Sequence, residues 1–137
     1  MEIYFGRRKV GNITSDREVT DPDTGLIQSI VGRIGYDGTV YKKTSNPRGP
    51  TTGILSWAII GSSEPSGRAS TKDSPRGNIA AAPYALSEVR VEPKGDVYIN
   101  EKYVGYVTDM KSDDDRQQAA GAVFILQHRV KNRLTQP

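Results

Sequence analysis

The feature that most constrains the fold of this chain is a short pattern that occurs twice. The stretches IYFGRRKVGNITS (3–15) and VYINEKYVGYVTD (97–109) match in kind at most positions, with β-branched or aromatic residues on either side of a polar break. Such a pattern predicts a β-hairpin. The break begins with Gly6 in one copy and Asn100 in the other, and both residue types tolerate the positive φ of a tight hairpin turn.

A second pattern overlaps the first. RIGYDGTVY (33–41) aligns with RVEPKGDVY (90–98), and each contains Arg, a β-branched residue, a three-residue gap, Gly, one residue, Val and Tyr. Pro93 suits the second position of a type I turn, and Gly38 and Gly95 suit the left-handed position that follows such a turn. Residues 88–108 are therefore predicted to form a strand, a bulged turn, a strand, a tight turn and a strand.

The triplet Val-Gly-x-β-branched, present in both copies of the first pattern, occurs again at 31–34. A glycine inside a strand typically marks a bulge, a bend or a close approach of another backbone, so an array of roughly four similarly bent hairpins is expected. The alternative is chance similarity, because short β segments draw on few residue types.

Two further segments carry signals of their own. GILSWAII (53–60) predicts a strand that contains the single tryptophan of the chain. Residues 61–77 contain Gly, Ser, Pro and charged residues with Ala69 as the only apolar side chain, which predicts a mobile loop inserted between hairpins. The alternative is a loop that becomes ordered on a partner.

Residues 112–133 break the β pattern and predict a helix. Ser112 is a suitable N-cap with Asp115 three residues later, and acidic residues fill the first turn, where the helix dipole favours anions. The centre, Ala119–Leu126, is apolar all round, which is typical of an enclosed helix. The predicted fold class is a β-rich α+β single domain over 1–137, in which repeated antiparallel hairpins form a flower- or barrel-like array around one C-terminal helix.

Hairpins of the VYxxxxxVGxV type at 4–13 and 98–107, together with the AAGAVFIL helix at 119–126, resemble the four-fold β-flower family of small bacterial and viral proteins. The resemblance covers about half of the chain and implies hairpins that radiate like petals with a helix alongside. It departs from the family pattern over 42–60, where no Val-Gly follows Tyr41 at the expected distance. No catalytic residue follows from the resemblance.

Bulk properties limit the location and the chemistry. The chain of 137 residues is long enough to bury a real core. It has no cysteine, lacks the apolar run of a secretory signal at its start, and its longest apolar run, Ala122–Leu126, is far shorter than the ~20 residues that span a bilayer. We expect a cytoplasmic protein with no membrane association. The net charge of +3 permits an anionic partner without requiring one.

No residue pattern predicts a catalytic centre, a metal site or a cofactor. The single histidine, His128, lies late in the predicted helix and is expected to be a surface residue. The carboxylates of 113–115 point about 100° apart on a helix and do not converge on one ion, so we interpret them as capping residues. DPDTG (21–25) resembles part of a calcium loop but lacks its glutamate and is better explained as a turn.

A low-specificity binding site is the one functional candidate. Basic residues adjoin tyrosines that share a position in the repeat, and basic turns beside aromatic side chains can hold a nucleotide or a single nucleic-acid strand by charge and stacking. The candidate residues are Arg7, Arg8, Lys9, Tyr41, Lys42, Lys43 and Tyr98. The alternative is that the tyrosines pack the outer parts of the hairpins and the cations provide solubility.

The sequence therefore leaves three functions open. The first is a non-enzymatic binding or assembly module, whose partner could be an anionic ligand, another protein or further copies of the chain. The second is a nucleic-acid or small-nucleotide binder that uses the basic hairpin turns and tyrosines. The third is an enzyme of unfamiliar type.

Overall fold

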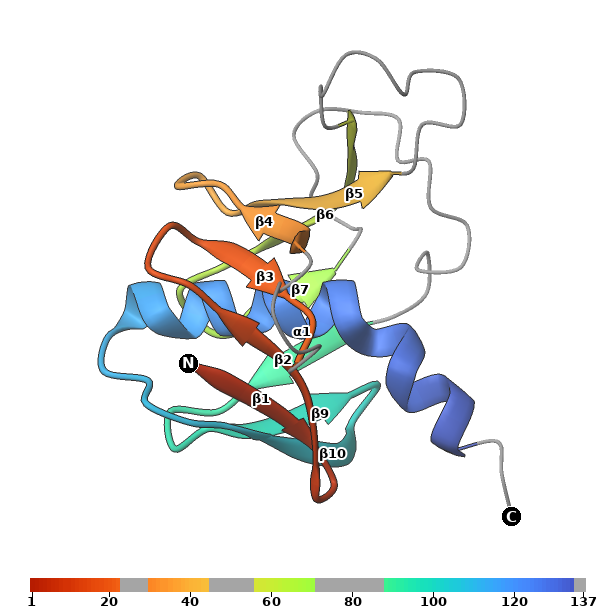
Figure 1. The fold of residues 1–137 in the computed structure, drawn as a ribbon. Helices are drawn as coiled ribbons and strands as arrows, with labels where there is room; N and C mark the ends of the chain where they lie inside the picture. The colour runs from red at the N-terminus through yellow and green to blue at the C-terminus, as the bar shows by residue number, and fades with distance from the viewer. Residues whose placement is uncertain (23–29, 45–55, 71–87, 135–137) are drawn as a thin grey trace.

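The fold is a closed antiparallel barrel with a helix along its axis (Figure 1). The computed structural model describes residues 1–22, 30–44, 56–70 and 88–134. These residues form ten strands and one helix: β1 (Glu2–Phe5), β2 (Arg8–Ile13), β3 (Glu18–Thr20), β4 (Ile30–Ile34), β5 (Thr39–Thr44), β6 (Ser56–Ser63), β7 (Arg68–Ser70), β8 (Glu88–Val91), β9 (Asp96–Ile99), β10 (Lys102–Val107) and α1 (Asp113–Leu134). The predicted fold class is confirmed.

The barrel is built from hairpins of consecutive strands. The pairs are β1–β2, β3–β4, β5–β6, β7–β8 and β9–β10, and each hairpin also pairs with the next one along the chain. The barrel closes where β1 pairs with β10 and Ile3 lies opposite Val107. The described residues thus contain five hairpins where the sequence predicted roughly four. Membership of the four-fold β-flower family stays a prediction.

The predicted turns have the expected backbone geometry. Gly6 begins the β1–β2 turn with φ +62°, and Asn100 and Glu101 occupy the β9–β10 turn with φ +50° and +67°. In the bulged turns, Gly38 and Gly95 adopt φ +89° and +106°. The chain over 88–108 accordingly forms the predicted series of three strands and two turns.

The prediction of a mobile loop over 61–77 is wrong for residues 61–70. Strand β6 continues to Ser63, a bulged turn follows with Gly67 at φ +89°, and β7 covers Arg68–Ser70. The inward positions carry Gly61, Ser63 and Ala69. All three are buried, but each is too small or too polar to stand out as hydrophobic in the sequence. Backbone pairing orders this segment instead, as when the Ser63 N–H donates to the Gly38 carbonyl at 2.7 Å. Residues 71–77 lie outside the described part of the chain.

Each hairpin places one small residue opposite a larger apolar one inside the barrel. The opposed pairs are Ile3 with Gly11, Val19 with Gly32, Val40 with Gly61, Ala69 with Val89, and Val97 with Gly105. In the four glycine-containing hairpins the register shifts directly beyond this pair, which marks a bulge. In β7–β8 the small residue is on the first strand and the register stays regular. The Ile60-Gly61 step therefore occupies the place of the Val-Gly step that the sequence lacks after Tyr41.

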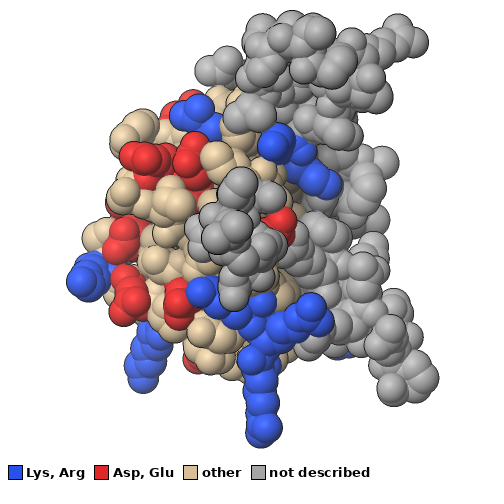
Figure 2. Space-filling view, in the orientation of Figure 1, with Lys and Arg blue, Asp and Glu red and all other residues tan. Residues whose placement is uncertain are grey.

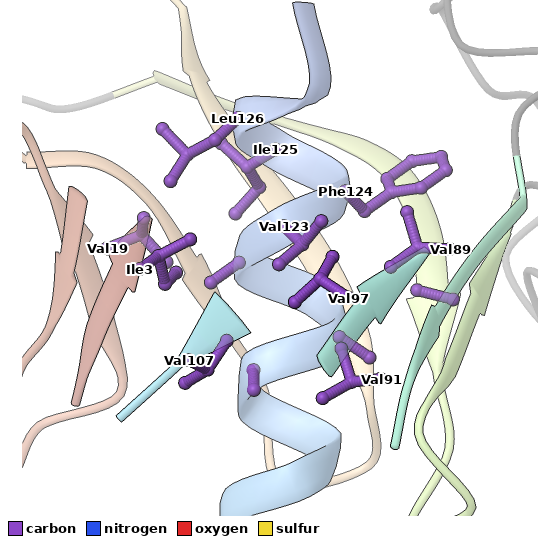
Figure 3. Packing of buried hydrophobic residues seen from close by; sticks show 14 of the residues in the cluster. Ile3, Val19, Val89, Val91, Val97, Val107, Val123, Phe124, Ile125 and Leu126 are labelled. Atoms are coloured by element: carbon purple, nitrogen blue, oxygen red, sulfur yellow. The ribbon is translucent and has the colours of Figure 1, made fainter. Parts of the chain in front are cut away.

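Helix α1 is enclosed by these hairpins, as its all-round apolar centre predicted. Every residue from Gln117 to Gln127 is buried. The consecutive side chains Phe124, Ile125 and Leu126 extend toward three different hairpins, where a Cβ on Gly61, Gly32 or Gly11 would lie 2.9, 2.6 or 2.7 Å from them. Figure 3 shows these side chains on different sides of the helix, among apolar residues of the surrounding strands. Gly11, Gly32 and Gly61 therefore make room for the helix, whereas Gly105 makes room for the backbone of β1.

Polar contacts fix the start of the helix to one end of the barrel. The Ser112 hydroxyl accepts the Asp115 N–H at 3.1 Å, which confirms the predicted cap. Arg116 Nε donates to the Val91 carbonyl at 2.7 Å, and Gln117 Nε2 donates to the Ser63 carbonyl at 2.9 Å. Both carbonyls belong to the last residue before a bulged turn, so helix side chains complete the hydrogen bonding of this barrel end.

In the described part of the chain, no helix has the length and apolar character needed to cross a membrane. The same residues contain no group of three or more His, Asp or Glu side chains placed to hold a metal ion.

The close approach at Gly105 gives a first prediction. A Cβ at this position would run into the backbone oxygen of Tyr4, which cannot move without breaking the β1–β10 pairing. Gly105→Ala should therefore lower the free energy of unfolding by about 1–3 kcal/mol in urea denaturation. Gly11→Ala should cost less, because its nearest neighbour is Cδ1 of Leu126, the end of a side chain that can adjust.

The matched control is Gly6→Asn. Nothing lies within 4 Å of a Cβ on Gly6, and Asn100 already adopts a positive φ at the corresponding turn position. This variant should keep the wild-type denaturation midpoint. A Gly105→Ala protein with an unchanged midpoint would contradict the close packing of β10 against β1.

The enclosure of α1 gives a second prediction. A Cβ on Gly121 would lie 2.7 Å from Cγ1 of Ile34 and 3.2 Å from Cγ2 of Val40. Gly121→Leu should overpack the barrel and destabilise it by about 1–3 kcal/mol or more. Helix propensity alone predicts the opposite sign, since Gly is about 1 kcal/mol less favourable than Ala in a helix. A chemical denaturation curve that showed a stabilised variant would exclude the enclosed helix.

Candidate binding site

An open groove on the outside of the barrel combines aromatic and charged side chains. We call it the aromatic groove, and it has a volume of about 490 Å³. It is lined by Arg33 of β4, by Gly35, Tyr36 and Asp37 of the β4–β5 turn, by Tyr41 of β5 and by Trp57 of β6. Ligand pockets commonly measure about 300–1,000 Å³, so the groove has the size of a small-ligand site.

Strand geometry brings Arg33 over two aromatic rings. Because Gly32 and Ile34 face the barrel interior, Arg33 points outward, and it lies opposite Tyr41 in the β4–β5 pair. Its guanidinium carbon is 5.9 Å from the Tyr41 ring centroid and 6.0 Å from that of Trp57. These distances are at the outer limit of a cation–π contact, so the arginine extends across β5 toward the tryptophan while staying solvent-exposed.

Tyr36 forms a prominent edge of the groove. Its side chain is 87% exposed, and the guanidinium of Arg17 lies 4.5 Å from its ring centroid. Arg17 itself is buried and held by three contacts: Nε donates to the Ile34 carbonyl at 2.9 Å, Nη2 to the Gly35 carbonyl at 3.0 Å, and Nη1 to both carboxylate oxygens of Asp114 at 2.9 Å. A fixed cation therefore supports the exposed tyrosine.

The charges are separated along the groove. At the turn end, the Asp37 carboxylate accepts the Thr39 N–H at 2.9 Å, which fixes the turn and places an acceptor beside the rings. At the far end of β5, the exposed Lys43 lies opposite Trp57. From the β4–β5 turn along β5, the order is therefore a hydrogen-bond acceptor, then the aromatic rings with Arg33, and then a second cation. This order suits a ligand with a polar ring system at one end and an anionic group at the other.

The residues proposed from the sequence do not form one site. Arg7 and Arg8 lie at the tip of the first hairpin, and Lys9 of β2 forms an ion pair with Glu2 at 2.9 Å. Strands β3 and β4 separate this hairpin from β5, which carries Tyr41, Lys42 and Lys43. Tyr98 lies on β9, next to β10. Of the predicted set, only Tyr41 lines the aromatic groove, and Lys43 lies opposite Trp57 of the groove in the β5–β6 pair.

Sequence reasoning missed the other five residues that line the groove. Arg33, Gly35, Tyr36 and Asp37 belong to the RIGYDG segment, which was interpreted only as part of a hairpin, and Trp57 was interpreted only as part of a strand. Strand alternation was a usable signal, since it places Arg33 and Tyr41 on the outer face of two consecutive strands. The adjacency of Trp57 depends on the register between β5 and β6, which no local pattern specifies.

Carboxylates gather on one part of the face drawn in Figure 2, toward the end of the barrel at which α1 begins. The bulged turns and the first helical turn supply them, including Asp16, Asp37 and Asp113–Asp115. An anionic ligand is therefore favoured away from this end, toward Arg33 and Lys43.

Comparison with known proteins provides no relative: no family model, no curated protein and no solved structure matches this chain. The candidate function therefore rests on the geometry of the groove.

The Arg17–Asp114 pair gives a prediction about pH. Hydrogen bonds from Arg17, assisted by Gln118, hold the pKa of the Asp114 carboxyl below its ordinary value despite partial desolvation. A carboxyl whose pKa is lower in the folded state contributes stability above its unfolded pKa, about 4, and loses that contribution as the pH falls through the folded value. Asp114→Asn should thus be less stable than wild type at neutral pH, and the difference should shrink in acid.

Thermal denaturation from neutral pH to strongly acidic pH measures this difference. Asp113→Asn is the matched control, because Asp113 is the neighbouring exposed carboxylate and makes no ion pair among the described residues. The control removes a first-turn charge without an ion pair, so its difference from wild type should be clearly smaller than that of Asp114→Asn. An Asp114→Asn profile that ran parallel to wild type throughout would show that the pair does not contribute.

Proposed function

We propose that the protein is a non-enzymatic binding module whose contact surface is the aromatic groove. The observation that carries this proposal is the position of Arg33 over Tyr41 and Trp57, with Asp37 on one side and Lys43 on the other. The closed barrel supplies the rigid support, because Arg33 and Tyr41 stand on paired strands and Arg17 fixes the adjoining turn. An enzyme of unfamiliar type stays an alternative, and a cytoplasmic location stays a prediction from the sequence alone.

Within this proposal, the favoured ligand is a small nucleotide or a short single strand of nucleic acid. A base can stack on an aromatic side chain or on an arginine, and each such stack typically contributes about 1–3 kcal/mol. A phosphate would lie at Lys43 and Arg33, and the amino or hydroxyl groups of the nucleotide would face the Asp37 carboxylate. A purely anionic ligand would leave the rings unused, and a neutral aromatic one would leave the cations unused.

Trp57 gives a direct measurement, because it is the only tryptophan of the chain and lines the groove. Adenosine monophosphate and short oligonucleotides should change its fluorescence in a saturable way. Adenosine and inorganic tripolyphosphate, each of which carries only half of the ligand chemistry, should bind more weakly. Binding of the oligonucleotide should fall steeply with salt, since contacts to phosphates release counterions.

Substitutions show whether the change in Trp57 fluorescence reports binding in the aromatic groove. Arg33→Ala should weaken nucleotide binding by about tenfold or more, and Arg33→Lys should restore only part of it, because lysine keeps the charge but loses the planar stacking surface. Arg68→Ala on β7 is the control for loss of one exposed cation outside the groove. Fluorescence that responded to no nucleotide, or an Arg33→Ala protein that bound like wild type, would exclude the proposal.

A further inference from the structure

A second aromatic surface lies where the barrel closes. We call it the tyrosine band, and it consists of Tyr4 on β1, Tyr103 and Tyr106 on β10, and Tyr98 on β9. Tyr4 and Tyr106 stack with their ring centroids 4.8 Å apart, and Tyr98 and Tyr103 meet edge to face at 5.7 Å. Tyr103 is 57% exposed and Tyr106 is 38% exposed. Their mutual contacts hold the rings in place while their outer surfaces face solvent.

In one row of side chains that crosses this band, the two end residues carry opposite charges. The strand register places Lys9, Tyr4, Tyr106 and Asp96 side by side across β2, β1, β10 and β9. The row therefore begins with a cation and ends with a carboxylate, with two stacked rings between them. Asp96 forms no side-chain ion pair or hydrogen bond with the described residues, whereas Lys9 pairs with Glu2 at 2.9 Å. The acidic end of the row is thus available to a further cation.

We propose that the tyrosine band is the docking surface for a second copy of this chain. A two-fold axis that runs parallel to the strands, between β1 and β10, superposes the row of one copy on that of the other in reversed order. Lys9 of each copy then lies opposite Asp96 of the other, and the tyrosines meet at the centre. An arrangement that is self-complementary under a two-fold axis is what an isologous dimer requires.

The composition of the band and the topology of the barrel favour a second copy of the chain over an anionic ligand. Aromatic side chains at the centre and charges at the rim are typical of protein–protein interfaces, in which tyrosine is enriched. The cations beside the rings are already paired, Lys9 with Glu2 and Arg90 with Glu92 and Glu101, whereas the Asp96 carboxylate at the end of the row would repel phosphate. The closed barrel leaves no free strand edge among the paired strands, so association here uses side chains rather than added backbone pairing.

The test is sedimentation equilibrium of the full chain over a wide range of protein concentration. The wild-type protein should pass from monomer to dimer as its concentration rises. Tyr106→Lys should weaken the dimer by about tenfold or more, because it replaces a central ring by a charge. Circular dichroism and thermal denaturation establish that each variant is folded.

Exchanging the charges of Lys9 and Asp96 tests how the two copies are oriented in the dimer. Lys9→Glu and Asp96→Lys should each weaken the dimer, since each creates two like-charge contacts across the two-fold axis. The double variant restores opposite charges at both contacts and should recover most of the wild-type association. Lys111→Glu reverses an exposed cation outside the band and should leave the dimer unchanged.

Any one of three results would overturn the proposal. The first is a wild-type protein that stays monomeric at every concentration. The second is a dimer that responds to Lys111→Glu as strongly as to Lys9→Glu. The third is a folded double variant that associates no better than the single variants. Because the aromatic groove lies on β4–β6, nucleotide binding measured through Trp57 is a separate result, and either proposal can fail without the other.

Discussion

An apolar helix with no polar face can exist in water only if other elements surround it, and this requirement organises the whole barrel. The centre of α1 projects large side chains in successive directions, so the hairpins that carry Gly11, Gly32 and Gly61 must all approach the helix closely. A hairpin with large inward residues on both strands would stand too far away. One small residue on each hairpin solves this, and the bulges beside the glycines bend the strands around the axis. The same glycines allow neighbouring hairpins to meet and close the ring.

Local chemistry explains why much of this was predictable from the sequence. Gly6, Asn100, Gly38 and Gly95 reveal turns because few residue types accept their backbone conformations. The helix was visible because its caps and its uniform apolar centre are properties of a single segment. Strand β7 was not visible, since its one inward side chain, Ala69, is small and its order comes from pairing with β6 and β8. The aromatic groove was visible only in part, because Arg33, Tyr41 and Trp57 come together through the register of three strands.

The inside and the outside of the barrel follow separate rules. Inward positions are restricted to apolar or small residues by the helix, and changing them alters stability. Outward positions on the same strands are free of that restriction, so aromatic and charged side chains can accumulate there without disturbing the core. The aromatic groove on β4–β6 and the tyrosine band on β1, β10 and β9 are two such accumulations on different sectors of one scaffold. They differ in charge, since the groove presents Arg33 without an ion pair among the described residues, whereas the cations beside the band, Lys9 and Arg90, are paired with carboxylates.

The pairing of β1 with β10 has a consequence for how the chain reaches its folded state. Ile3 and Val107 are directly opposed, although most of the chain separates them in sequence. As the ribosome releases the chain from its N-terminus, the early strands emerge while the partner of β1 and the helix that fills the interior are still missing. Long-range closure of this kind slows folding relative to folds dominated by local contacts. Until β10 and α1 emerge, the strands lack both the element that closes the barrel and the one that covers their apolar side, so the barrel depends on the last third of the sequence.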